Sequence, residues 1–129
     1  MLDQVQDAHL WALFLRPVAQ TWQNGRVALL GDAAHPTLPF MAQGACLALE
    51  DAWVLARSFR ENSDVESALQ AYQTARRPRA QKVVAAASAN ARNFHLRGPM
   101  RLAAQMALAI AGPRLGRRYE WIYSYDATT

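Results

Sequence analysis

The stretch from Arg26 to Ala56 constrains this chain most, because it predicts a strand, a loop and a helix in a set order. The apolar run Val27–Leu30 predicts a buried strand that ends at Gly31. Residues 32–44 contain two prolines and show no helical period, which predicts a loop. Apolar residues then recur at helical spacing from Gly44 to Arg60. The stripe expected to be buried on this helix consists of Ala45, Ala48, Leu49, Ala52, Trp53 and Ala56.

The residues before this stretch predict a second strand. Leu10–Leu15 is a continuous apolar run, and Pro17 closes it. Gln23–Arg26, with the sequence QNGR, is a turn signal between that run and Val27. We therefore expect two strands joined by a loop.

Helices are expected in the second half of the chain. Ser63-Asp64-Val65-Glu66 matches a capping box, in which the Ser63 hydroxyl accepts from the Glu66 amide. Pro78 lacks a backbone N–H, so the helix that begins there should kink or restart near it. One side of its first part should carry Val65, Leu69, Tyr72 and Arg76, and its second part should carry Val83, Val84, Ala87, Ala91 and Phe94.

A further helix should run from Gly98-Pro99 to Gly112-Pro113, followed by an aromatic tail over residues 119–125 that needs a surface to pack on. The fold class that results is a mostly helical α+β fragment. It has a short two-strand remnant, a loop and three or four helices, in a single unit over residues 1–129.

The charge of the chain is unevenly distributed. The net charge is +4, and no Asp or Glu occurs between Ser67 and Tyr119. The ten cationic residues of this interval are Arg76, Arg77, Arg79, Lys82, Arg92, Arg97, Arg101, Arg114, Arg117 and Arg118. A basic helical module for nucleic acid is one interpretation, but a solvated face or a face against an acidic neighbour is simpler. Arg76, Arg77 and Arg79 are expected to be solvated or to pair with another helix.

Several classes of protein are disfavoured by composition. A single cysteine, Cys46, excludes a disulfide framework and a multi-cysteine metal site, and it suits a reducing cytoplasm. Met1 is not followed by a basic and then apolar stretch, so we expect no signal peptide. The apolar residues 103–111 are too few to span a bilayer. We expect a cytoplasmic chain that binds no metal and does not enter a membrane.

The Gly31-Asp32 turn and the helix that follows form a candidate cofactor cradle. Glycine lets a ligand approach the backbone at the end of a strand. The Asp32 carboxylate can accept hydrogen bonds from a sugar or polyol. A helix that begins near Gly44 offers unpaired amides and a positive dipole end, which stabilise negative charge on a ring or an oxyanion.

These residues resemble a known family. Gly31-Asp32-Ala33-Ala34-His35, then Pro36, Pro39 and Ala42-Gln43-Gly44, and then Glu50-Asp51-Ala52, are similar to the second FAD-binding motif of the flavin-dependent aromatic hydroxylases. The sequences of residues 72–79 and 117–121 resemble the salicylate and 3-hydroxybenzoate hydroxylase branch. The resemblance implies an enzyme that uses NADH or NADPH to reduce FAD and then hydroxylates a phenolic or aromatic acid. It does not establish that this chain is an enzyme.

The resemblance also implies roles for matching positions. Gly31 and Asp32 would hold the ribityl chain of FAD, and the loop from Pro39 would lie against the flavin ring. Backbone amides around Gln43, Gly44 and Ala45 would face the ring edge. Phe40 and Met41 are candidates for the pocket of the aromatic substrate. No residue is assigned a catalytic role.

Four other residues of this region have simpler interpretations. His35 is expected to order the loop, and Asp51 to tie its helix to nearby backbone. Cys46 is expected to be a small buried residue. Many relatives have glycine where this chain has Ala42.

One part of the family pattern is absent from the sequence. The six glycines cannot be arranged as G-x-G-x-x-G, so no dinucleotide-binding fold for the ADP half of FAD is expected. The chain would then be the C-terminal piece of such an enzyme, and the alternative is a non-catalytic remnant or a docking half that needs a partner. Either predicts self-association or pairing through exposed apolar residues, with Leu10, Trp11, Leu13, Phe14, Phe40 and Met41 as candidates.

Overall fold

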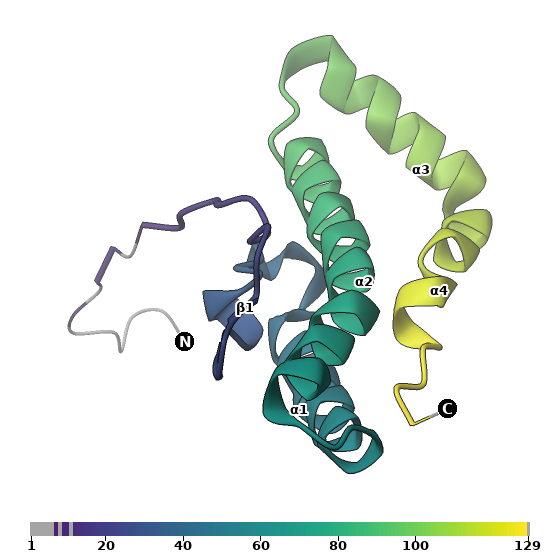
Figure 1. Ribbon diagram of the computed structural model, residues 1–129. Coiled ribbons are helices and arrows are strands. Elements are labelled where there is room, and N and C mark those ends of the chain that lie inside the picture. Colours follow the sequence, from purple (N-terminus) through teal and green to yellow (C-terminus); the bar gives the residue numbers. More distant parts are fainter. Residues whose placement is uncertain (1–6, 8, 11, 129) are drawn as a thin grey trace.

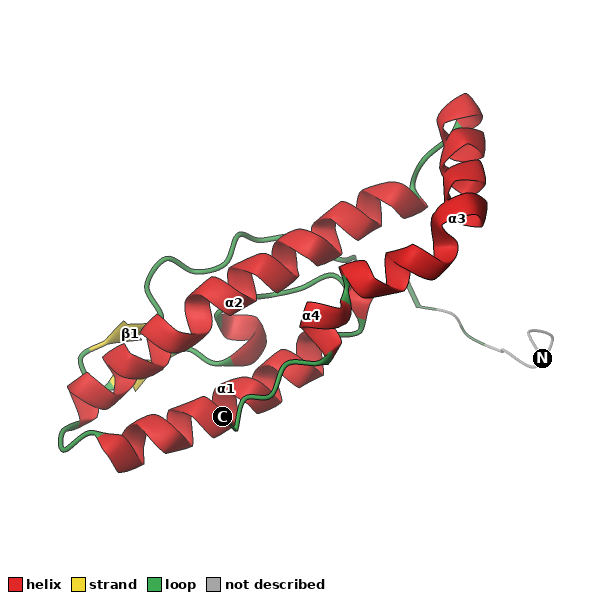
Figure 2. Ribbon diagram, turned by 90° about the vertical axis from the view of Figure 1, so that its right-hand side faces the viewer, coloured by secondary structure: helices red, strands yellow, loops and turns green. Residues whose placement is uncertain are grey.

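The computed structural model describes residue 7, residues 9–10 and residues 12–128, without the side chains of residues 94, 111 and 113–116. Within this part the fold is mostly helical, and a two-stranded hairpin precedes the helices (Figures 1 and 2). The helices described are α1 (Gly44–Glu61), α2 (Val65–Phe94), α3 (Gly98–Arg118) and α4 (Glu120–Tyr123). The expected fold class, with one small sheet and up to four helices, is confirmed.

The hairpin lies closer to the turn signal than expected. β1 (Gln23–Asn24) pairs antiparallel with β2 (Val27–Ala28), with Gln23 opposite Ala28 and Asn24 opposite Val27. Gly25 between them has a φ of +56°, which glycine adopts readily in a tight turn. The pairing ends soon afterwards, because Gly31 has a φ of +60° and turns the chain.

The strand expected over Leu10–Leu15 is wrong. Leu10 and residues 12–15 form no strand and are exposed, and Trp11 lies outside the described residues. Apolar content makes a segment suitable for a sheet, but a strand also needs a neighbour to pair with its backbone. The expected strand over Val27–Leu30 is shortened to Val27–Ala28, although the Leu29 amide still donates to the Trp22 carbonyl at 2.7 Å.

Helices α1 and α2 lie side by side and form the centre of the molecule (Figures 1 and 2). The predicted extent of α1 is confirmed to within one residue. Its predicted buried stripe is wrong, because the side that faces α2 consists of Leu47, Asp51, Val54 and Ser58. Leu49 and Trp53, which were expected in the core, are 72% and 47% exposed. Hydrophobic spacing alone therefore pointed to the opposite face.

The buried side of α2 matches the prediction in part, because Val65 and Ala91 are only partly buried and the side chain of Phe94 lies outside the described residues. Leu69, Tyr72 and Arg76 are buried, and so are Val83, Val84 and Ala87 further along. The main core cluster joins Tyr72, Ala80 and Val84 to Val18, Trp22, Ala34 and Val54. The exposed Pro78 does not interrupt α2, contrary to expectation, because packing on both sides of it outweighs one missing hydrogen bond.

The C-terminal part returns toward α2. The helix end expected at Gly112-Pro113 is wrong, because α3 continues as far as Arg118. In α4, Ile122 packs against Met41 and Ala87 in a second small core cluster. The aromatic tail thus finds the surface that it was expected to need, although Trp121 and Tyr123 remain largely exposed.

The start of α2 is capped by a different residue from the one that the sequence pattern suggested. The carboxylate of Asp64 accepts a hydrogen bond of 2.9 Å from the Ser67 amide, and Asp64 rather than Ser63 is the N-cap. We predict that Asp64→Ala lowers the melting temperature of the chain by a few degrees, while Ser63→Ala leaves it unchanged. Thermal unfolding followed by circular dichroism tests this, and the reverse order would restore the Ser63 capping box.

Candidate functional site

The Gly31-Asp32 turn is a short 3-10 segment, Gly31–Ala33. It follows β2 after Leu29 and Leu30. The Gly31 carbonyl accepts from the amides of Ala34 and His35, at 2.9 Å each. A Cβ on Gly31 would lie 3.3 Å from the Ala48 Cβ on α1, in addition to the strain of a φ of +60°. Only glycine satisfies both conditions, so α1 can approach the turn closely.

Asp32 lies exposed beside the start of α1. Its Oδ1 atom is 3.9 Å from the position that a Cβ on Gly44 would occupy, and the Thr37 Cγ2 atom is 3.4 Å from the same point. Gln43 is buried at the N-cap position, and its side chain makes no capping hydrogen bond. A free carboxylate and a helix start without a side-chain cap are therefore neighbours.

The remaining predicted residues follow the loop between these two features. Pro39 is exposed at the start of a second 3-10 segment, Pro39–Met41, and Ala45 is exposed in the first turn of α1. Ala42 separates them with a φ of +51°, in the left-handed region. The structure thus brings Asp32 next to Gly44 at the start of α1, with Gly31 and Gln43 buried and with Pro39 and Ala45 exposed.

The two residues proposed for a substrate pocket lie differently. Phe40 is half-buried and stacks edge-on against His95, with ring centroids 6.0 Å apart. Met41, expected to be exposed, is instead buried with Ala87 and Ile122. Its place between α2 and α4 explains the difference, and Phe40 is the more accessible of the two.

Asp51 joins this turn to both long helices. It is fully buried, and its Oδ2 atom accepts from the Gly31 amide at 3.2 Å and lies 2.5 Å from the Nε2 atom of His35. Its Oδ1 atom accepts from Arg76 Nε on α2 at 2.7 Å. The expectation that Asp51 ties α1 to backbone is confirmed, and it also pairs with two side chains. His35 orders the loop, as expected, through its contact with Asp51, and its Nδ1 atom has no hydrogen-bond partner among the described residues.

The charges of this cluster balance one another. Burial disfavours the ionised form of Asp51, but hydrogen bonds and charge from His35 and Arg76 lower its pKa below the ordinary value. Burial also opposes the charge on Arg76, yet Asp51 and Glu50 raise its pKa. Burial and the Asp51 charge raise the pKa of Tyr72, whose hydroxyl donates to the Leu29 carbonyl at 3.2 Å.

A second ion pair extends the cluster toward the C-terminus. Arg79 donates two hydrogen bonds of 2.7 Å to Glu50, which also pairs with Arg76 at 2.7 Å. The Arg79 guanidinium lies 3.6 Å from the centre of the Tyr125 ring. Arg77 donates to the Gln20 carbonyl at 2.6 Å. Arg76 and Arg79 are therefore neutralised by the carboxylates of α1, whereas Arg77 bonds an uncharged backbone carbonyl.

The chemistry available at the turn is that of a polyol and anion cradle. Asp32 supplies an acceptor for hydroxyl groups, and the start of α1 supplies amides and a positive dipole end. The close approach of Ala48 to Gly31 and of Thr37 to Gly44 holds the turn and the loop against the start of α1. Residues 2–87 match a family model described as an FAD binding domain. The chain belongs to the FAD-dependent aromatic monooxygenases.

Curated relatives agree with this family. The chain is 39% identical over 129 residues to 3-amino-4-hydroxybenzoate 2-monooxygenase PtmB3 of Streptomyces platensis, and 38% identical over 128 residues to 3-hydroxybenzoate 6-hydroxylase of Polaromonas naphthalenivorans. It is 35% identical over 130 residues to salicylate hydroxylase of Pseudomonas putida. Each match covers 98% of this chain, but only 32%, 32% and 29% of the relative. The monooxygenase chain thus spans about a third of the length of the curated relatives it matches.

Some features of this family member differ from expectation. Cys46 is exposed in the first turn of α1, where it was expected to be buried. Sequence reasoning did not single out Arg76 as a site-supporting residue, although an arginine in register with Leu69 and Tyr72 was a usable signal. None of the described helices combines the length and apolarity needed to cross a bilayer.

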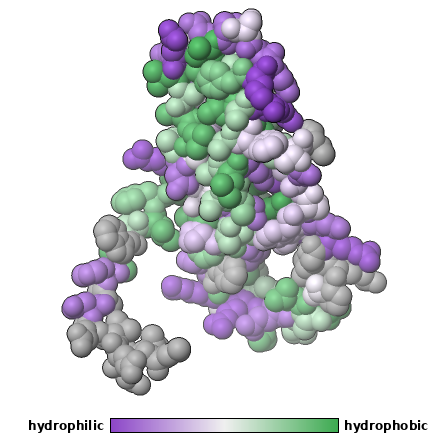
Figure 3. Space-filling view, turned by 90° about the horizontal axis from the view of Figure 1, so that it is seen from below, coloured by the Kyte–Doolittle hydropathy of each residue, from purple (hydrophilic) through white to green (hydrophobic). Residues whose placement is uncertain are grey.

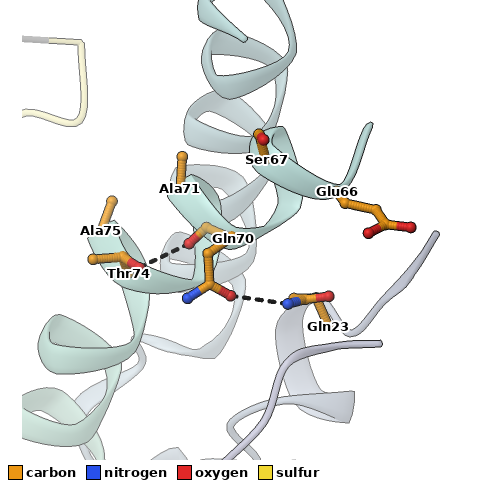
Figure 4. A pocket seen from close by; sticks show the side chains of 7 residues that line it. All are labelled: Gln23, Glu66, Ser67, Gln70, Ala71, Thr74 and Ala75. Atoms are coloured by element: carbon orange, nitrogen blue, oxygen red, sulfur yellow. Dashed lines mark hydrogen bonds between the residues drawn. The ribbon is translucent and has the colours of Figure 1, made fainter. Parts of the chain in front are cut away.

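Two surface hollows lie away from the turn. One is shallow and lies between the hairpin and the start of α2, where Gln23 donates to Gln70 at 2.9 Å (Figure 4). The other lies between the end of α2 and α3, near Asn93, Arg101 and Leu108. Neither is lined by a predicted cofactor residue, so the candidate site is an open edge rather than either hollow.

The buried cluster makes a sharp prediction for stability. Arg76→Met keeps the length of the side chain but leaves Asp51 with a reduced set of partners, and we expect it to cost about 3–5 kcal/mol of unfolding free energy. Arg77→Met is the matched control and should cost about 1 kcal/mol or less, because Arg77 makes one exposed hydrogen bond. Urea unfolding measures both, and equal costs would contradict the role given to Arg76.

The same cluster predicts an acid dependence. Because the pKa of Asp51 is lowered on folding, its contribution is fully present above the unfolded pKa, about 3.9 for a free aspartate. The contribution is lost as the pH falls through the folded pKa. We expect the unfolding free energy to fall in this window and Asp51→Asn to flatten that fall. Identical pH slopes for the two proteins would show that Asp51 does not titrate as described.

Proposed function

We propose that this chain supplies the flavin-edge part of an FAD-dependent, NAD(P)H-consuming enzyme that hydroxylates a phenolic or aromatic acid. The observation that carries the proposal is the position of Asp32 beside a start of α1 that has no side-chain cap. Family membership supports the choice of FAD over other anionic polyols.

Each residue of the cradle has a distinct role in this proposal. Asp32 accepts hydrogen bonds from the ribityl hydroxyls, and Gly31 allows the backbone to come close to them. Amides at Gln43, Gly44 and Ala45, with the helix dipole, stabilise negative charge at the edge of the ring. Pro39 limits the position of the ring from the loop side. FAD itself supplies the redox chemistry.

The substrate class follows from the relatives. Those named above act on hydroxybenzoates or salicylate, as their names state, so we propose a hydroxylated aromatic acid here. Phe40, half-buried at the loop, is the better candidate for contact with that ring. Hydrogen bonds from later parts of the chain hold this loop in place. Tyr123 donates to the Met41 carbonyl, and Asn90 donates to the Phe40 carbonyl.

The isolated chain should bind FAD weakly. The cradle addresses the ribityl chain and the ring edge, and the sequence contains no G-x-G-x-x-G to hold the pyrophosphate. We predict no saturable binding at micromolar FAD in a titration followed by flavin fluorescence. Stoichiometric binding at that concentration would mean that these contacts suffice alone.

The roles of Asp32 and His35 can be separated in a chimera. In it, the matching third of the P. naphthalenivorans hydroxylase is replaced by this chain. We predict that Asp32→Ala weakens FAD binding about ten-fold to a hundred-fold, because a charge-assisted hydrogen bond is lost, without lowering the melting temperature of the FAD-free chimera. His35→Ala should lower the melting temperature, since His35 is a buried partner of Asp51.

A matched control removes the same charge elsewhere. Glu61→Ala, at the other end of α1, should change neither quantity. If Asp32→Ala keeps its FAD while His35→Ala loses it with an unchanged melting temperature, the two roles are reversed.

A further inference from the structure

Met41 is buried, although it lies in the loop that leads to the start of α1. Its exposed fraction is 5%, whereas Met100 and Met106 on α3 are 66% and 60% exposed. Exposed apolar side chains are common in this chain, as the view from below shows (Figure 3). The burial of Met41 therefore needs a specific cover, which Ile122 of α4 and Ala87 of α2 provide.

Arg79 of α2 holds this cover in place. The short helix α4 returns beside α2 near the end of the chain (Figures 1 and 2). Arg79 Nη2 donates to the Ile122 carbonyl at 3.2 Å, and Nη1 donates to the Trp121 carbonyl at 3.4 Å. Carbonyls in the last turn of a helix have no partner within that helix, so donors from α2 satisfy them. Ile122 is thus bound to Arg79 through its backbone and to Met41 through its side chain.

Arg79 is itself fixed by α1. Its side chain is only 9% exposed, and it donates two hydrogen bonds of 2.7 Å to Glu50. The next residue of α1, Asp51, accepts from the Gly31 amide. Two adjacent carboxylates of α1 therefore hold two parts of the candidate site. Asp51 holds the Gly31 turn directly, and Glu50 holds the loop of residues 39–41 through Arg79 and α4.

We propose that Arg79 is a positioning residue for the Pro39–Met41 loop. By holding α4 against α1 and α2, it fixes Met41 and with it Phe40, the residue proposed to contact the aromatic ring. The hydrogen bond of 3.4 Å from the Tyr123 hydroxyl to the Met41 carbonyl is too long to hold the loop alone. The part of this inference that concerns the reaction rests on the proposed function.

The contacts of Arg79 require a guanidinium and not merely a positive charge. A planar group with five donors can bind a carboxylate through two hydrogen bonds and still donate to carbonyls. Its face is also free to stack on Tyr125, whose ring centre lies 3.6 Å away. A lysine has one nitrogen, which cannot serve Glu50 and both carbonyls from separate directions. Arg79→Lys should therefore keep the ion pair and lose part of the hold on α4.

The first test measures the cover over Met41 in the isolated chain. Oxidation by hydrogen peroxide, followed by mass spectrometry, compares Met41 with the exposed Met100 and Met106 in the same sample. Arg79→Gln should raise the oxidation rate of Met41 at least about five-fold and leave the other two rates unchanged. Arg79→Lys should lie between this variant and the unsubstituted chain. Arg77→Gln removes the same charge from the same helix and should change no rate.

The second test uses the chimera with the P. naphthalenivorans hydroxylase described above. It measures the hydroxylated product formed per NADH consumed, together with the FAD content. Arg79→Gln should lower the product ratio at least about two-fold at an unchanged FAD content, because a displaced loop no longer holds the aromatic ring in place. Arg79→Lys should restore part of the ratio, and Arg77→Gln should match the unsubstituted chimera.

The two measurements can fail separately. An unchanged oxidation rate of Met41, or a rise matched by faster hydrogen exchange along the whole of α2, overturns the inference whatever the chimera does. Faster oxidation of Met41 with an unchanged product ratio overturns the positioning role in the reaction and leaves the proposed function standing. A chimera that holds no FAD and consumes no NADH removes the proposed function, while the oxidation rates still decide whether Arg79 positions the loop.

Discussion

The buried carboxylate of Asp51 is the interaction on which the arrangement of this chain depends. It joins the Gly31 turn, His35 in the loop and Arg76 on α2, which lie 20, 16 and 25 residues away from it. A buried carboxylate is costly without partners, so these contacts must form together. The turn, the loop and the two long helices therefore adopt their positions as one unit, and Asp32 gains a defined place without any hydrogen bond of its own to a described neighbour.

The sequence predicted those parts of the structure that depend on local chemistry. The turn at Gly25, the extent of α1 and the buried side of α2 follow from glycine, helical period and apolar spacing. The parts that it missed depend on distant partners. Leu10–Leu15 has the composition of a strand but no described neighbour to pair with, and Asp64 rather than Ser63 accepts from the Ser67 amide of α2. The grouping of Gly31, Asp32 and Gly44 was predictable from the motif, whereas the support from Arg76 and Arg79 required the packing of α2 on α1.

The wrong choice of buried face on α1 has a single physical cause. Apolar spacing indicates which faces of a helix are apolar. It does not indicate which of these faces packs against a neighbouring element. Here the polar residues Asp51 and Ser58 lie on the covered side because the ion cluster satisfies Asp51 there. The more apolar side carries Trp53.

Ala42 shows how conformational strain is distributed in the loop. Its φ of +51° places an alanine where glycine is at ease, at a cost of about 1 kcal/mol. A glycine at this position would relieve the native loop, but it would also widen the range of unfolded conformations. The two effects oppose each other, so the position can exchange between alanine and glycine with little net change in stability. A change between alanine and glycine at this position is then nearly neutral for folding. The choice between them depends on the conformation of the loop and not on packing in the core.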